Sequence, residues 1–139
     1  MVFLVEDNED DLLLTQRAFA KINLKNTVQV ARDGHAALQY LLSPDNVLPS
    51  LVLLDLKLPK VDGLEVLRRV RADERTMFLP VVVLTSSKED EDVLRSYSLG
   101  ANAYVHKPVD FAAFAEAVKT LGLFWLLLNE PAPAQRERP

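Results

Sequence analysis

Residues 50–67 of the chain read SLVLLDLKLPKVDGLEVL. The stretch begins with an apolar run, Leu51–Leu54, and places a carboxylate, Asp55, where that run stops. A short apolar run without alternation is typical of a strand buried on both faces, as in a parallel sheet. Because a buried carboxylate costs free energy unless it has partners, the position of Asp55 requires a functional explanation.

The residues after Asp55 indicate a short loop and then a helix. Pro59 stiffens the loop, and Gly63, which follows Asp62, lets the chain turn tightly into the helix. Apolar residues with helical spacing predict a helix after Gly63 and another near the amino terminus. The expected faces are Leu64, Leu67 and Val70 to Arg71 here, and Leu12, Thr15, Phe19 and Ile22 in the first helix.

Four more apolar runs resemble the first, and segments of helical period separate them. Strands separated by helices indicate a parallel sheet that helices cover on both faces, with right-handed crossovers. The pattern therefore predicts a doubly wound α/β domain with a five-stranded parallel sheet and five helices. The expected strands are Val2–Val5, Val28–Ala31, Leu51–Leu54, Val81–Leu84 and Ala103–Val105.

Composition narrows the class of protein. The 139 residues, 49% of them hydrophobic, are enough for one domain with a full core. A net charge of −4 argues against a nucleic-acid surface, and the absence of cysteine excludes disulfides, thiol chemistry and zinc-thiolate sites. The amino terminus, MVFLVEDNEDD, does not resemble a signal peptide, and no apolar run is long enough for a membrane span. We expect a cytoplasmic protein.

Polar side chains follow four of the predicted strands. Ligands of such sheets bind outside the carboxyl ends of the strands, so these side chains should converge on one edge. They are Glu6 and Asp7 after the first strand, Asp55 after the third, Thr85 after the fourth and Lys107 after the fifth.

These residue types predict a metal-assisted phosphoryl site. Carboxylates that lie close together repel unless they hold protons or share a cation, and oxygen ligands alone suit Mg²⁺. Beside such an ion Asp55 stays ionised and can attack phosphorus to form an acyl phosphate. The Lys107 ammonium and the Thr85 hydroxyl can then contact the phosphoryl oxygens. The two histidines, His35 and His106, do not lie at a carboxylate strand end.

The chain resembles the receiver domain of two-component response regulators through LVEDN, LVLLDLKLPKVDG, VVVLTSS and GANAYVHKP, in this order. The resemblance implies a flavodoxin-like sheet of strand order 2-1-3-4-5 and phosphorylation of Asp55 by a histidine kinase. It further implies Mg²⁺ ligation by Asp7, Asp55 and the Lys57 carbonyl, with Glu6 acting through water. Thr85 and Tyr104 would form a switch pair, Lys107 would contact the phosphate, and the bond from Lys107 to Pro108 would be cis.

A narrower resemblance concerns the single-domain response regulators of bacterial phytochromes, which are light-sensing histidine kinases. It rests on RDGHAALQYL, LDLKLPKVDGLEVL, PVVVLTSS and the aromatic pair Phe124 and Trp125. It implies a phytochrome-type kinase as partner.

Two other functions remain as alternatives. A pseudo-receiver that only scaffolds usually lacks an acidic residue, the acceptor or the lysine, and this chain has them all. An aspartyl-phosphate phosphohydrolase needs a second aspartate two residues after the nucleophile, where this chain has Lys57.

Lys57 and Ser87 flank the opening of the site, and we expect them to affect the lifetime of the acyl phosphate in a direction that the sequence does not fix. His106 should point away from the site, and His35 should lie at the surface.

The carboxyl-terminal segment predicts a dimer. Phe111, Phe114, Val118, Leu121, Trp125 and Leu128 form an apolar stripe along a final helix of about 19 residues. Beyond Gly122 this helix is apolar on all sides, so we expect a second copy to cover it, or else the end folds back on its own core. The expected contacts are Leu123, Phe124, Trp125, Leu127 and Leu128. The receiver would span residues 1–128, and 129–139 would be a disordered tail, leaving no sequence for an output domain.

Overall fold

The computed structural model describes residues 1–21, 26–85, 97–107 and 111–120. Its five strands form one parallel sheet in the order β2-β1-β3-β4-β5. Each strand lies within one residue of its predicted range, and the doubly wound fold and the strand order are confirmed. The strands are β1 (Val2–Val5), β2 (Val28–Ala31), β3 (Leu51–Asp55), β4 (Val81–Thr85) and β5 (Ala103–His106).

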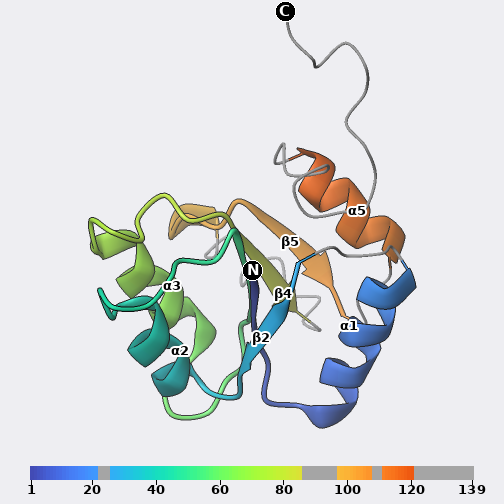
Figure 1. Ribbon diagram of the computed structural model, residues 1–139, viewed down its shortest axis with the longest axis horizontal. Helices are drawn as coiled ribbons and strands as arrows, with labels where there is room; N and C mark the ends of the chain where they lie inside the picture. The colour runs from blue at the N-terminus through green and yellow to red at the C-terminus, as the bar shows by residue number, and fades with distance from the viewer. Residues whose placement is uncertain (22–25, 86–96, 108–110, 121–139) are drawn as a thin grey trace, which may run out of the picture.

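Helices cover both faces of the sheet (Figure 1). The helices α2 (Gly34–Leu41) and α3 (Gly63–Ala72) lie on one face, and α1 (Glu9–Lys21) and α5 (Phe111–Thr120) lie on the other. The described residues thus contain four of the five expected helices. The remaining one was expected between β4 and β5, where residues 86–96 lie outside the described part of the chain.

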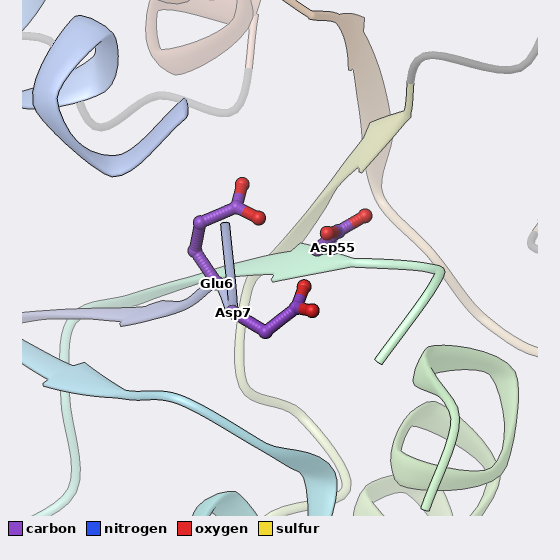
Figure 2. A group of neighbouring side chains, drawn as sticks. All are labelled: Glu6, Asp7 and Asp55. Carbon is purple, nitrogen blue, oxygen red and sulfur yellow. The ribbon is translucent and has the colours of Figure 1, made fainter. Parts of the chain in front are cut away.

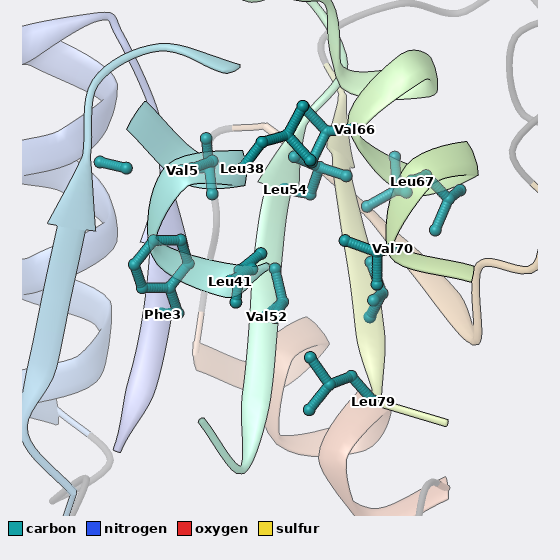
Figure 3. Close-up of a cluster of buried hydrophobic side chains, with 14 of the residues drawn as sticks. Phe3, Val5, Leu38, Leu41, Val52, Leu54, Val66, Leu67, Val70 and Leu79 are labelled. Carbon is teal, nitrogen blue, oxygen red and sulfur yellow. The ribbon is translucent and has the colours of Figure 1, made fainter. Parts of the chain in front are cut away.

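Each face of the sheet has its own apolar core. The three central strands are buried along their whole length, whereas the edge strands β2 and β5 are buried only in part. Because successive residues of a strand point to opposite faces, Phe3 and Val5 pack toward α2 and α3, and Val2 and Leu4 pack toward α1 and α5. Figure 3 shows the first of these cores between the strands and the helices.

The predicted helix faces are confirmed in α1 and only partly correct in α3. Leu12, Thr15 and Phe19 are buried, and Ile22 lies outside the described residues. In α3 the buried side chains include Leu67, Val70 and also Val66, which the predicted face did not contain. Leu64 and Arg71 are half-buried. The Arg71 guanidinium donates two hydrogen bonds to the Gly100 carbonyl and thereby connects α3 to the loop before β5.

The expected final helix is described only in its first half. Phe114 of α5 is fully buried, and its ring packs at a tilt on Phe19 with centroids 4.9 Å apart. The dimer contacts expected at residues 123–128 lie outside the described residues. Among the residues that the structure describes, no helix combines the length and apolar character needed to cross a bilayer.

Candidate functional site

Three carboxylates meet at the carboxyl edge of the sheet, as predicted. Glu6 and Asp7 follow β1, and Asp55 is the last residue of the neighbouring strand β3. One carboxylate oxygen from each lies within 4.8 Å of the others, and Figure 2 shows the three side chains gathered between the strand ends. Glu6 and Asp55 are buried, whereas Asp7 is exposed. The cluster is therefore open to solvent on the side of Asp7.

Lys107, which follows β5, brings a positive charge into this cluster. Its Nζ donates hydrogen bonds to Glu6 Oε1 at 3.0 Å, to Asp55 Oδ2 at 3.1 Å and to Asp11 Oδ2 at 2.8 Å. The Lys107 side chain is only 7% exposed. Its ammonium is thus shared among three carboxylates in a largely buried position, and charge-assisted hydrogen bonds of this kind are stronger than neutral ones.

Burial and mutual repulsion control the charge of the site. Burial raises the pKa of Glu6 to about 7, helped by the hydrogen bond and the charge of Asp55 and opposed by Lys107. For Lys107, burial favours the neutral amine, but Asp11, Asp55 and Glu6 outweigh it and raise its pKa above the ordinary lysine value. Lys107 is therefore a fixed cation at neutral pH, and it balances only part of the negative charge around it.

The donor set fits a divalent cation. Three carboxylates that supply oxygen atoms and one exposed edge for water or phosphate are the arrangement that hard cations prefer. Burial is the main cause of the raised pKa of Glu6, and the neighbouring carboxylate of Asp55 adds to it. A divalent ion held by Asp7 and Asp55 would offset the negative charge of these carboxylates.

The loop after β3 fixes the second oxygen of Asp55. The backbone N–H of Lys57 donates to Asp55 Oδ1 at 3.2 Å, while the Lys57 side chain is exposed, as expected. Gly63 is needed because a Cβ there would lie 2.3 Å from the carbonyl oxygen of Asp55. The left-handed backbone of the turn falls instead at Lys60, with φ of 69°. The role of Gly63 is thus close approach, and the expected turn conformation falls three residues earlier.

Thr85 and Tyr104 project from the same face of the sheet. Tyr104 pairs with Val83 in the register of β4 and β5, and Val83 and Thr85 share a face because they are two residues apart. Thr85 is buried. The Tyr104 ring is 38% exposed and makes edge contacts with Tyr97 and His106. Tyr104 therefore lies outward and partly exposed, on the same face of the sheet as Thr85.

The remaining predicted positions divide into two groups. His106 and His35 are exposed, and His106 points away from the carboxylates while Lys107 points toward them, as predicted. Ser87 and Pro108 lie outside the described residues, and the expected cis bond at Pro108 falls with them.

Asp11 is a site residue that the sequence analysis missed. It lies in the first turn of α1, one turn before the buried Thr15, so it sits at the end of the helix face that packs on the sheet. Its spacing from Thr15 could have identified it, because position 11 lies beside Leu12 and Thr15 on the buried face of the helix. Asp11 is the last residue of the acidic run EDNEDD, so the sequence does not distinguish it from its exposed acidic neighbours.

Comparison with known proteins identifies the family. Residues 2–119 match the family described as response regulator receiver domain. The chain belongs to this family. The acidic cluster fits a divalent-metal site of the kind typical of receivers, and the fold described above is the receiver fold.

Three relatives place this receiver more closely. The bacteriophytochrome response regulator AtBRR is 53% identical, with a TM-score of 0.82 over 93% of this chain and 96% of that chain. Response regulator Rcp1 of Synechocystis is 35% identical over 91% of this chain and 88% of its own length. Its Mn²⁺-bound structure gives a TM-score of 0.74 over 96% of this chain and 98% of that chain. The protein named "Probable methanogenesis regulatory protein FilR2" of Methanothrix harundinacea is 43% identical over 96% of this chain and 89% of its own length.

Proposed function

We propose that this receiver accepts a phosphoryl group on Asp55 from a sensor histidine kinase and thereby changes a binding surface. The observation that carries the proposal is the Lys107 ammonium, held 3.1 Å from Asp55 Oδ2 in a buried group of carboxylates. That geometry supports a role for Lys107 as a fixed cation beside the oxygens of an incoming phosphoryl group. Cations in such positions stabilise the charge that develops in phosphoryl transfer.

The chemistry proceeds by nucleophilic attack of Asp55. A carboxylate oxygen attacks phosphorus, the bond from phosphorus to the imidazole nitrogen of the kinase breaks, and the imidazole leaves with the electron pair. Lys107 and the Thr85 hydroxyl are the side-chain donors to the phosphoryl oxygens. Asp7, Asp55 and the Lys57 carbonyl would hold Mg²⁺, with Glu6 acting through water, and the ion would neutralise the remaining oxygen charge.

A two-state switch follows from the same residues. Thr85 moves toward the phosphoryl group, and Tyr104 leaves its outward position between Tyr97 and His106 to fill the space. The receiver catalyses only its own phosphorylation and dephosphorylation, so it acts on partners by binding and does not turn over a separate substrate. A cytoplasmic location agrees with this role.

The similarity to the bacteriophytochrome response regulator AtBRR supports a phytochrome-type histidine kinase as the partner. Phosphotransfer from a panel of purified kinases tests this assignment. A clear preference for a kinase without a phytochrome sensor would contradict it.

The test of the proposed function is incubation of the full chain with acetyl phosphate and Mg²⁺, followed by intact mass spectrometry. We expect the mass of one added phosphoryl group, and no addition when a chelator removes the metal. A folded chain that gains no mass with Mg²⁺ would be a pseudo-receiver scaffold. Sustained release of inorganic phosphate from an unrelated phosphomonoester would indicate a phosphohydrolase.

The apolar segment after α5 supports a homodimer as part of this function. The proposed contacts lie between residues 123 and 128, outside the described part of the chain. They are Leu123, Phe124, Trp125, Leu127 and Leu128. Sedimentation at micromolar concentration should give a dimer for the wild type and a weakened dimer for Trp125→Ala. A monomeric wild type would exclude this assembly.

A further inference from the structure

Asp11 is the residue of the site whose role the proposed function leaves unassigned. The Asn8 side chain accepts a hydrogen bond from the Asp11 backbone N–H at 2.9 Å, so Asn8 caps α1. Because Asn8 makes the capping contact, the Asp11 carboxylate can accept a hydrogen bond from the Lys107 ammonium instead, at 2.8 Å. This is the shortest of the hydrogen bonds that Lys107 Nζ donates to the described carboxylates.

Asp11 differs from the other two carboxylate partners of Lys107. Glu6 and Asp55 belong to the group of three that could hold a metal ion, whereas Asp11 approaches Lys107 from α1. Phosphoryl transfer converts the Asp55 carboxylate into an acyl phosphate, so the contact between Lys107 and Asp55 must change during the reaction. The contact with Asp11 does not involve the reacting atoms and can persist through the reaction.

We propose that Asp11 is a positioning residue that holds the Lys107 ammonium in place for the phosphoryl oxygens. This inference rests on the proposed function of Asp55. A lysine side chain has four rotatable bonds, and fixing it costs conformational entropy. A charge-assisted hydrogen bond to a carboxylate anchored in a helix restricts the ammonium before the phosphoryl group arrives.

The test compares Asp11→Asn with Asp10→Asn. Asp10 is the preceding residue in the same first turn of α1 and is exposed, so both variants lose one negative charge near the same helix end. At saturating Mg²⁺ and acetyl phosphate, Asp11→Asn should slow phosphorylation about tenfold, the size of one hydrogen bond to a charged group. Asp10→Asn should stay within about twofold of the wild type, as expected for an exposed charge.

Mg²⁺ affinity, measured by calorimetry, separates positioning from metal ligation. We expect the two variants to bind Mg²⁺ with dissociation constants within about twofold of each other, because each loses one negative charge and neither residue belongs to the three carboxylates that could hold the ion. If Asp11→Asn lost Mg²⁺ affinity in proportion to its loss of rate, Asp11 would be a metal ligand and the proposal would be wrong. Equal phosphorylation rates in the two variants would also overturn it.

A second readout does not require phosphorylation. In nitrogen-15 NMR spectra, the Lys107 ammonium protons should exchange slowly with water in the wild type and in Asp10→Asn, and faster in Asp11→Asn. In a Lys107→Met background, Asp11→Asn should lower the free energy of unfolding no more than Asp10→Asn does. If the wild type accepted no phosphoryl group, the proposed function would fail, while these two measurements would still decide whether Asp11 holds Lys107.

Discussion

Asp55→Asn will abolish the gain of a phosphoryl group from acetyl phosphate. Asp55 is 4% exposed, and hydrogen bonds to Lys57 N–H and Lys107 Nζ hold its two carboxylate oxygens. Asparagine preserves the shape of the side chain but replaces one nucleophilic oxygen with an amide nitrogen and removes the charge. Intact mass spectrometry of the two proteins under identical conditions measures the result, and the expected incorporation in the variant is none.

Two controls make this result specific. Asp10→Asn removes an exposed charge from α1 and should incorporate one phosphoryl group, like the wild type. Asp7→Asn keeps the acceptor and loses a proposed metal ligand, so it should still be phosphorylated, but slowly and only at higher Mg²⁺. Incorporation by Asp55→Asn at the wild-type level would place the acceptor at another residue and would contradict the proposed chemistry.

The backbone of the site could be predicted from local sequence patterns. Apolar runs mark strands buried on both faces, and parallel topology brings their carboxyl ends to one edge. Glu6, Asp7, Asp55 and Lys107 were therefore expected at one edge of the sheet, and the strand order that makes them neighbours came from the resemblance to receiver domains. The structure brings these four side chains together as expected.

The contacts that depend on how helices pack could not be predicted in this way. Asp11 contacts Lys107 across 96 positions of the chain, and only the docking of α1 on the sheet decides which acidic residue of its first turn reaches the site. Gly63 was assigned to a turn because glycine favours turns, yet the constraint is the carbonyl of Asp55 beside it. Both cases involve a neighbour that is set by tertiary packing. Hydrophobic periodicity indicates which face of α1 carries Asp11, but it does not indicate which residue that face contacts.

Phe114→Ala is expected to lower the free energy of unfolding by about 3–5 kcal/mol, the usual cost of removing a buried aromatic ring. Phe114 is fully buried in the core between the sheet and the helices α1 and α5. Its ring packs on Phe19 of α1, so the substitution leaves a cavity where α5 meets both α1 and the sheet. Urea denaturation followed by far-UV circular dichroism measures the loss.

Phe78→Ala is the matched control, because the same atoms are removed from a side chain that is 87% exposed. It should change the free energy of unfolding by no more than about 0.5 kcal/mol, as is usual for surface positions. A similar small effect for both variants would mean that α5 does not depend on Phe114 for its packing. A large loss at Phe114 alone would show that this ring contributes strongly to the core in which α5 packs on the sheet.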